Sequence, residues 1–345
     1  GTLLVVLAMV LRRRRPGLEI EPWIRRPHYV QLLVQLGVFV YWGYAWQTVY
    51  EQFPLILTQV VFAYLVELLL SWRRYGRWRL GFGPFPIVFS TNLFIWFEDH
   101  LFVCQLAMVA LAYLSRDFIR WKRNGQRVHI FNPSALGLAL VGLVCIPLPA
   151  PEFCYDIAHE LNVTPSMTEF LILVALLAQL RVPIVLVSLG AAASLWASVE
   201  VPVFLSRYLS VDGLETFSTY VPIWYWSPVF LVLALLATDP KTIPKKPAGK
   251  LLFGLIVGAG IACASAALTA AGYNDFMAKV IPVPLANLLV PWCDRTAERL
   301  DERLRPALEP AWNRVHVALW VCLSALALLS PGNKANLFET DLHEM

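Results

Sequence analysis

The chain has little charge. Only 15% of its 345 residues are Asp, Glu, Lys or Arg, whereas 58% are hydrophobic. A water-soluble domain carries roughly 25% charged residues, so this composition offers too little polar material to cover a globular surface in water. The shortage of charge therefore excludes a soluble globular domain.

Motifs of a self-contained enzyme are also absent. The chain has no phosphate-binding loop, no glycine fingerprint for nucleotides and no Ser-His-Asp arrangement. Its six cysteines form no CxxC pair, and its six histidines show no helical pairing that would ligate a haem or a metal. We therefore predict no catalytic residue and no metal site, and we expect an electron-transfer subunit at most.

What the chain does contain is long apolar segments. A helix of about 20 apolar residues crosses the hydrocarbon core of a bilayer with every backbone amide satisfied internally. Segments that meet or approach this length are residues 28–50, 53–71, 100–115, 133–148, 167–180, 182–205, 221–237 and 251–271, with weaker candidates at 84–97, 278–292 and 315–330. They predict an all-α polytopic membrane protein with about ten transmembrane helices. Residues 1–11 are apolar but short, and fit either a trimmed span or a signal anchor.

Basic residues indicate how the chain crosses the membrane. Four loops are strongly basic, at residues 12–26, 73–79, 116–127 and 241–250. An even number of predicted spans separates each loop from the next, so all four fit on the cytoplasmic side, where Lys and Arg accumulate. Because each cluster adjoins a span, we predict a role in topology and not in nucleic-acid binding.

Two parts of the chain follow one plan. In the first, span 100–115 is followed by a basic loop, by Phe-Asn-Pro at 131–133 and by a helix rich in small residues. In the second, span 221–237 is followed by Thr-Asp-Pro at 238–240, a basic loop and a glycine-rich helix. Asn-Pro and Asp-Pro each break a helix and offer a side chain that can cap the next one. We therefore predict two related five-helix halves with interrupted helices, a plan that favours a binding site at their interface.

The same motifs resemble one family of integral membrane redox subunits. The strings HIFNPSALG at 129–137, ATDP at 237–240 and PAGKLLFG at 247–254 are similar, in this order, to those of the RnfD/NqrB family. Residues 284–295 also resemble the family's last span and its exit, and the loop at 160–169 resembles the divergent UnbU-like branch. The resemblance covers residues 28–295. It leaves residues 1–27 as a partial span with a basic loop, 296–330 as an amphipathic helix with an additional span, and 331–345 as a polar tail.

The resemblance implies a subunit of a multisubunit complex in the bacterial inner membrane. Such a complex passes electrons between flavins, other redox centres and a quinone or ferredoxin, with other membrane subunits as partners. Family members carry FMN on a threonine of a Ser-Gly-Ala-Thr type sequence, which this chain lacks. Its loop at 160–169 is similar instead to a family segment close to a second, noncovalent flavin site. FMN or another flavin is therefore implied, with covalent attachment disfavoured.

Eight residues are candidates for holding the flavin: Asn132, Pro133, Thr164, Ser166, Thr168, Thr238, Asp239 and Lys250. Asn132 and Thr238 can donate hydrogen bonds. The helix starts after Pro133 and around Lys250 would present free amides to an anion. Asp239 is expected to cap a helix or to pair with a nearby lysine, either Lys241 or Lys250.

The segment before residue 167 allows two interpretations. Thr164 or Thr168 is a substitute acceptor for a covalent flavin. The favoured interpretation is ordinary N-capping, by Thr164 or Ser166, of the helix that begins near Met167.

Two features outside these motifs add expectations. Glu67 lies in an apolar segment, where a carboxylate is costly, so we expect it to relay a proton or to pair with an arginine such as Arg73. Residues 295–308 carry mixed charges with leucines four apart, which predicts an amphipathic helix on the membrane surface or against a partner subunit.

Two other functions fit the same sequence. A cofactor-free scaffold subunit of a larger assembly is consistent with the missing flavin-attachment sequence. A urea-channel-like transporter is consistent with two halves and broken helices.

Overall fold

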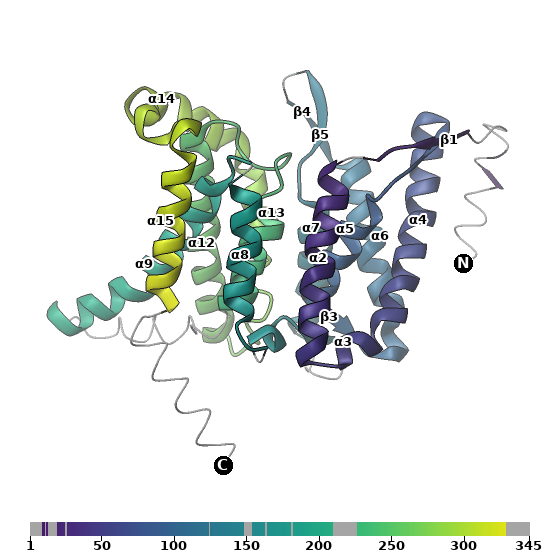
Figure 1. Cartoon of the computed structure of the whole chain (residues 1–345), viewed down its shortest axis with the longest axis horizontal. Coiled ribbons are helices and arrows are strands. Elements are labelled where there is room, and N and C mark those ends of the chain that lie inside the picture. Colours follow the sequence, from purple (N-terminus) through teal and green to yellow (C-terminus); the bar gives the residue numbers. More distant parts are fainter. Residues whose placement is uncertain are drawn as a thin grey trace, which may run out of the picture. The chain divides into compact units, whose positions relative to one another are not determined.

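The computed structural model describes residues 9–10, 12, 19–24, 26–123, 125–147, 154–162, 164–180, 182–209 and 226–328. The chain divides into two compact units, unit 1 from Gly1 to Ile157 and unit 2 from Ala158 to Met345. Both units are mostly helical (Figure 1). Most of residues 1–27 and all of the expected tail at 331–345 lie outside the described residues.

Four helices are long and apolar enough to cross a membrane. They are Phe53–Tyr75, Asp99–Phe118, Val185–Pro202 and Pro247–Ala270. Pro133–Cys145 and Met167–Leu177 are shorter apolar helices. The described part of the chain therefore has the composition and helix lengths of a helical membrane protein. Its long spans are fewer than the ten that the sequence predicts.

Unit 1 combines helices with short strands. In chain order it contains β1 (Glu19–Pro22), α2 (Arg26–Ala45), α3 (Thr48–Glu51), α4 (Phe53–Tyr75), β2 (Arg77–Leu80), α5 (Pro84–Asn92), β3 (Ile95–Phe97), the 3-10 helix η1 (Asp99–Leu101), α6 (Phe102–Phe118), β4 (Arg120–Arg123), β5 (Gln126–His129), α7 (Pro133–Cys145) and β6 (Cys154–Asp156). The strands form three two-stranded sheets, of which β1–β2 is parallel, whereas β3–β6 and β4–β5 are antiparallel.

The expected span at 84–97 is wrong. Helix α5 has nine residues, ends at Asn92, and gives way to strand β3. Four buried amide side chains, here called the amide cluster, surround this break: Gln35, Gln59, Asn92 and Gln105. Gln59 and Asn92 bond to each other through both of their amide groups, at 2.6 and 3.1 Å, and Gln105 donates to Asn92 Oδ1 and to the carbonyl of Ile95, both at 3.1 Å. These bonds satisfy polar groups that a broken helix would otherwise leave unpaired in an apolar core.

Unit 2 contains longer helices and one π-helical segment. In chain order it contains the 3-10 helix η2 (His159–Asn162), α8 (Met167–Gln179), α9 (Val185–Leu209), α11 (Trp226–Leu231), the π-helix η4 (Val232–Leu236), α12 (Pro247–Ala270), α13 (Pro282–Leu288), α14 (Val290–Leu308), the 3-10 helix η5 (Pro310–Trp312) and α15 (Asn313–Leu328).

Three expected segments of unit 2 differ from the structure. The expected span at 278–292 is instead the seven-residue helix α13 followed by the start of α14. The described part of 221–237 is α11 plus a π-helix, and residues 221–225 lie outside the described residues. The expected amphipathic helix exists as α14, but it begins earlier, at Val290.

Helices α9 and α12 lie side by side at glycines (Figure 1). A Cβ atom at Gly254 would meet the carbonyl group of Val187, and one at Gly258 would meet the carbonyl oxygen of Ala191. Gly190 makes the reciprocal approach to the backbone of Leu251. Small residues thus let the two backbones touch, which is how apolar helices gain packing energy in a membrane.

Candidate functional site

Asn132 is at the start of α7 and is buried. Its side-chain Oδ1 accepts a hydrogen bond from the backbone N–H of Ala135 at 3.2 Å, so Asn132 is the N-cap of the helix. Pro133 follows as the first helical residue, where a missing N–H costs no hydrogen bond. The predicted helix start is therefore confirmed, with the Asn132 acceptor engaged by its own helix.

Thr238 and Asp239 form the turn after the π-helix η4. The hydroxyl of Thr238 donates to the carbonyl of Ala234 at 2.7 Å, and the side chain is 4% exposed. Asp239 accepts from the backbone N–H of Lys241 at 3.1 Å. This bond closes a turn and does not cap a helix, because α12 begins only at Pro247, with Lys246 as its N-cap. This turn carries the chain from η4 to the Lys-rich segment that precedes α12.

Lys250 lies in the first turn of α12. Its ammonium donates to the carbonyl of Pro183, just before α9, at 2.7 Å. The expected pairing of Lys250 with Asp239 is therefore wrong within the described residues, because Lys250 instead ties the start of α12 to the start of α9.

Thr164 precedes α8 and differs from the other candidates. Its side chain is 3% exposed, and its hydroxyl oxygen has no hydrogen-bond partner among the described residues. N-capping of α8 by the Thr164 side chain is therefore wrong, and only its backbone carbonyl takes part, by accepting from Met167 N–H at 3.2 Å. Ser166 has a φ of 50°, so the chain makes a left-handed turn immediately before the helix. Thr168 lies in the first turn of α8.

The structure does not bring all of these residues together. Within unit 2, Thr164, Ser166 and Thr168 lie at the start of α8, whereas Pro183 and its partner Lys250 lie beyond its end. A helix of this length rises about 20 Å. Asn132 and Pro133 belong to unit 1. The start of α8 and the start of α12 are thus separate places in unit 2.

The orphaned hydroxyl of Thr164 is the feature that fits a flavin. A buried O–H without an acceptor is costly, and a flavin edge offers acceptor atoms together with an apolar ring. The side chains nearby in the chain suit such a ring, because Leu161 and Met167 are both buried. The described residues of this segment therefore fit a noncovalent group, whereas a buried hydroxyl is poorly placed to carry a phosphoester.

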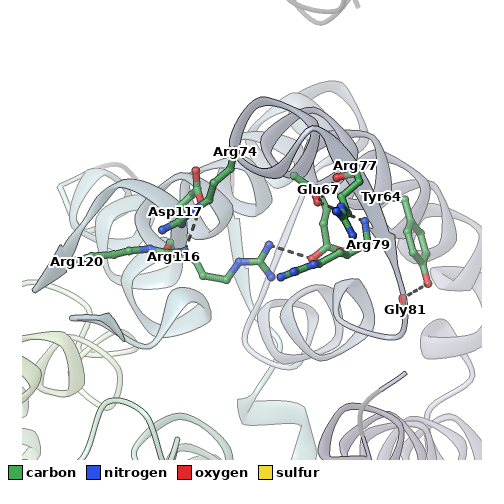
Figure 2. Close-up of polar contacts among 10 residues, drawn as sticks. Tyr64, Glu67, Arg74, Arg77, Arg79, Gly81, Arg116, Asp117 and Arg120 are labelled. Carbon is green, nitrogen blue, oxygen red and sulfur yellow. Dashed lines mark hydrogen bonds and ion pairs between the residues drawn. The ribbon is translucent and has the colours of Figure 1, made fainter. Parts of the chain in front are cut away.

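Sequence reasoning did not identify the partner of Glu67. Glu67 on α4 pairs with Arg116 on α6, with Arg116 Nη2 and Glu67 Oε1 3.0 Å apart, and not with Arg73 (Figure 2). The guanidinium of Arg116 also lies over the ring of Tyr113, 4.5 Å from its centroid. Positions six apart on one helix point in different directions, whereas α4 and α6 pack against each other.

The Glu67–Arg116 pair lies beside the loop that leads into α5. Tyr64 donates to the carbonyl of Gly81 at 2.8 Å. A Cβ atom at Gly83 would lie 3.4 Å from the Glu67 carboxylate and 3.8 Å from the imidazole of His28. Tyr113, fully buried, has a hydroxyl without a hydrogen-bond partner in the described part of the chain. The pair therefore links α4 to α6, and Tyr64 on α4 links that helix to the loop before α5.

The amide cluster is a second group that sequence reasoning missed. Each of its four members interrupts an otherwise apolar segment, and polar residues in such segments mark functional or structural contacts. The signal was present in the sequence, but only the fold shows that Gln59, Asn92 and Gln105 bond to one another, and that Gln35 donates to Ser90 of α5 at 2.7 Å.

No family model matches the chain, and no curated protein is significantly similar to it. Its functional assignment therefore rests on the residues and contacts described above.

Proposed function

We propose that the chain is a membrane subunit of an electron-transfer complex of the RnfD/NqrB kind, which holds a flavin noncovalently. The proposal joins the sequence resemblance to a helical structure with four long apolar helices. Its partners would be other membrane subunits of a bacterial inner-membrane complex and a quinone.

The observation that carries the proposal is the unpartnered hydroxyl of Thr164. The resemblance associates this segment with a noncovalent flavin, and the hydroxyl is a buried donor with no acceptor among the described residues. A donor fixed in an apolar surrounding forms a stronger hydrogen bond than it would in water. Burial also excludes water from the ring of a bound cofactor.

A bound flavin would supply one- and two-electron transfer. The residues of the chain would bind and orient it. The Thr164 hydroxyl would donate to an oxygen of the flavin, and the buried side chain of Met167 would be part of the apolar surrounding of the ring. The left-handed turn at Ser166 fixes the direction of the segment.

The first experiment is the visible spectrum of the full chain purified in mild detergent, followed by acid denaturation. We expect a yellow protein whose chromophore is released into the supernatant by acid. Thr164→Val should lower the flavin content about tenfold, because one buried hydrogen bond contributes about 1–1.5 kcal/mol. Thr164→Ser, which keeps the hydroxyl, should retain the flavin.

A matched control uses another threonine of the chain. Thr58 is exposed on α4 and donates to the carbonyl of Pro54 in its own helix, so Thr58→Val should leave the flavin content unchanged. A colourless wild-type protein that is monodisperse would overturn the proposal. Chromophore that stays on the polypeptide after acid would instead show covalent attachment.

A second function is favoured by a separate observation. The side chains of Asn132, Thr238 and Lys250 are each engaged in bonds within their own unit, as expected of a cofactor-free scaffold. Cross-linking and mass spectrometry of native membranes would test it. A colourless chain that remains bound to other membrane subunits supports the scaffold and contradicts the flavin proposal.

A further inference from the structure

Arginines outnumber carboxylates at the end of unit 1 where α4 and α6 finish. Asp117 accepts from Arg74 at 2.7 Å and from Arg120 at 3.3 Å (Figure 2). We call these three residues the Asp117 cluster. One carboxylate forms ion pairs with two guanidinium groups, so the cluster carries one positive charge in excess.

A second cluster repeats this arrangement on the β1–β2 sheet. The carboxylate of Glu21 on β1 lies 3.6 Å from the Arg77 guanidinium and 3.3 Å from that of Arg79, both on β2. We call these three residues the Glu21 cluster. It also has an excess of one positive charge.

One aromatic ring joins the two clusters. The guanidinium carbon of Arg79 lies 4.2 Å from the centroid of the Tyr75 ring, and that of Arg74 lies 5.5 Å from it. On its other side Arg79 lies 4.3 Å from the ring of Trp23. The two clusters therefore form one continuous surface of arginine and aromatic side chains, held in place by cation–π contacts.

Positive charge at this surface is not fully balanced. Burial and the neighbouring charge of Arg74 lower the pKa of Arg120 from its ordinary value. An anion with several acceptor oxygens would balance the excess charge and accept hydrogen bonds from the guanidinium groups.

Exposed apolar side chains lie among the arginines. They are Tyr75, Leu80, Phe118 and Ile119, each between 39% and 53% exposed, and we call them the apolar border. Because α4 and α6 are long enough to span a membrane and both end here, this border is at the depth where acyl chains meet headgroups. A freely soluble anion has no apolar part that could contact this border.

We propose that this end of unit 1 is a binding site for anionic phospholipids. The arginines of the Asp117 and Glu21 clusters bind the phosphate, and the acyl chains lie against the apolar border. The general excess of arginine in cytoplasmic loops accounts for the number of these residues, but not for two carboxylates that are each shared by two arginines. A zwitterionic lipid would bring an ammonium group towards the surplus positive charge, so the site should discriminate by headgroup charge.

The test is a lipid titration of the full chain in detergent, followed by native mass spectrometry. Phosphatidylglycerol and phosphatidylcholine are compared for the wild type and two double variants, Arg74→Gln/Arg120→Gln and Arg77→Gln/Arg79→Gln. Each interfacial arginine contributes about fivefold in affinity for an anionic lipid. Each double variant should therefore bind phosphatidylglycerol about 25-fold more weakly and phosphatidylcholine as before.

Matched variants control for charge and folding. Lys245→Gln/Lys246→Gln removes the same charge from unit 2 and should leave the preference for phosphatidylglycerol intact. Arg→Lys versions of both pairs keep the charge and should retain most of the preference. Raising the salt concentration should weaken the wild-type preference, which tests the proposal even where a Gln variant does not fold.

Three outcomes would overturn the proposal. The wild type binds both lipids equally, the control in unit 2 loses as much affinity as the arginine variants, or inorganic phosphate displaces the lipid at equal concentration. The last result would identify a site for soluble phosphate instead of a lipid.

Discussion

At the scale of single residues, the ion pair of Glu67 and Arg116 shows what a charge inside an apolar helix requires. Both side chains are mostly buried, with side-chain exposures of 14% and 25%. Removing one partner leaves a desolvated charge without a counterion, which costs more than removing both. The sequence predicted an arginine partner for Glu67 but suggested the wrong one, because distance along the chain says nothing about which helix lies alongside.

We predict that Glu67→Gln and Arg116→Gln each destabilise the protein by about 2–3 kcal/mol, which lowers the Tm in detergent by roughly 4–8 °C. The double variant should recover part of this loss, as measured by tryptophan fluorescence on heating. Arg73→Gln is the control, because Arg73 is on the same helix as Glu67 but stacks on Phe118 of α6 and has no carboxylate partner in the described residues. Strictly additive losses in the double variant would show that the pair contributes no coupling.

Cys293 gives a prediction for pH. Burial, together with the neighbouring charge of Asp294, raises the pKa of this thiol to about 11. Since the folded state holds the proton more tightly than the unfolded state, this thiol stabilises the fold below its ordinary pKa of 9.0, and the contribution is lost as the pH rises towards 11.

Iodoacetamide should therefore leave Cys293 unmodified between pH 7 and 9 in the folded protein, because only the thiolate reacts. Peptide mass spectrometry after timed alkylation measures this. The same chain denatured in detergent before alkylation is the control and should be modified at Cys293. Rapid modification in the folded chain would contradict the burial of this side chain.

At the scale of elements, the two short helices α5 and α13 explain where sequence reasoning failed. Each begins with Pro-x-Pro, at Pro84 and at Pro282, and each ends beside a buried asparagine, Asn92 or Asn287. Asn287 donates to the carbonyl of Thr242 at 3.1 Å, much as Asn92 donates to the carbonyl of Val88. Apolar content identifies segments that avoid water, but it does not distinguish a full span from a short helix whose open end is satisfied by amide side chains.

The contact of α9 with α12 yields a prediction at this scale. Gly258→Ala should destabilise the protein by about 1–3 kcal/mol, because the new methyl group would overlap the Ala191 carbonyl oxygen and force the helices apart. Gly37→Ala on α2 is the control. Its added Cβ has no atom within 4 Å, so this change should be neutral or stabilising by about 0.5–1 kcal/mol. Thermal unfolding of both variants in the same detergent makes the comparison, and equal effects would argue against backbone contact.

At the scale of the whole molecule, the helical membrane class followed from composition alone. The sequence also predicted helix starts after Pro133 and around Lys250, and in the structure α7 begins at Pro133 and α12 at Pro247. The sheets were not predicted, because strands of three or four residues carry no periodicity that a pattern could reveal. Strands β1 and β2 lie together although α2 and α4 separate them in the chain.

We predict that the basic loops of the two units lie on the same side of the membrane. In a chain whose six native cysteines are replaced by alanine, Gln126→Cys and Lys245→Cys should react with an impermeant maleimide in inverted vesicles and not in intact cells. Glu98→Cys should show the opposite pattern. Labelling of Gln126→Cys and Lys245→Cys from different sides would refute the even number of crossings on which the topology depends.

The parallel pairing of β1 with β2 has a consequence for synthesis. Strand β1 ends at Pro22 and β2 ends at Leu80, so the first strand leaves the ribosome long before its partner exists. At about 5–20 residues per second, the edge of β1 stays open for roughly 3–12 s. During that interval α2 and α4 are synthesised. The sheet can therefore close only after both helices have been synthesised. A nascent chain that stalls earlier keeps β1 unpaired and exposed to the proteases of the quality-control system.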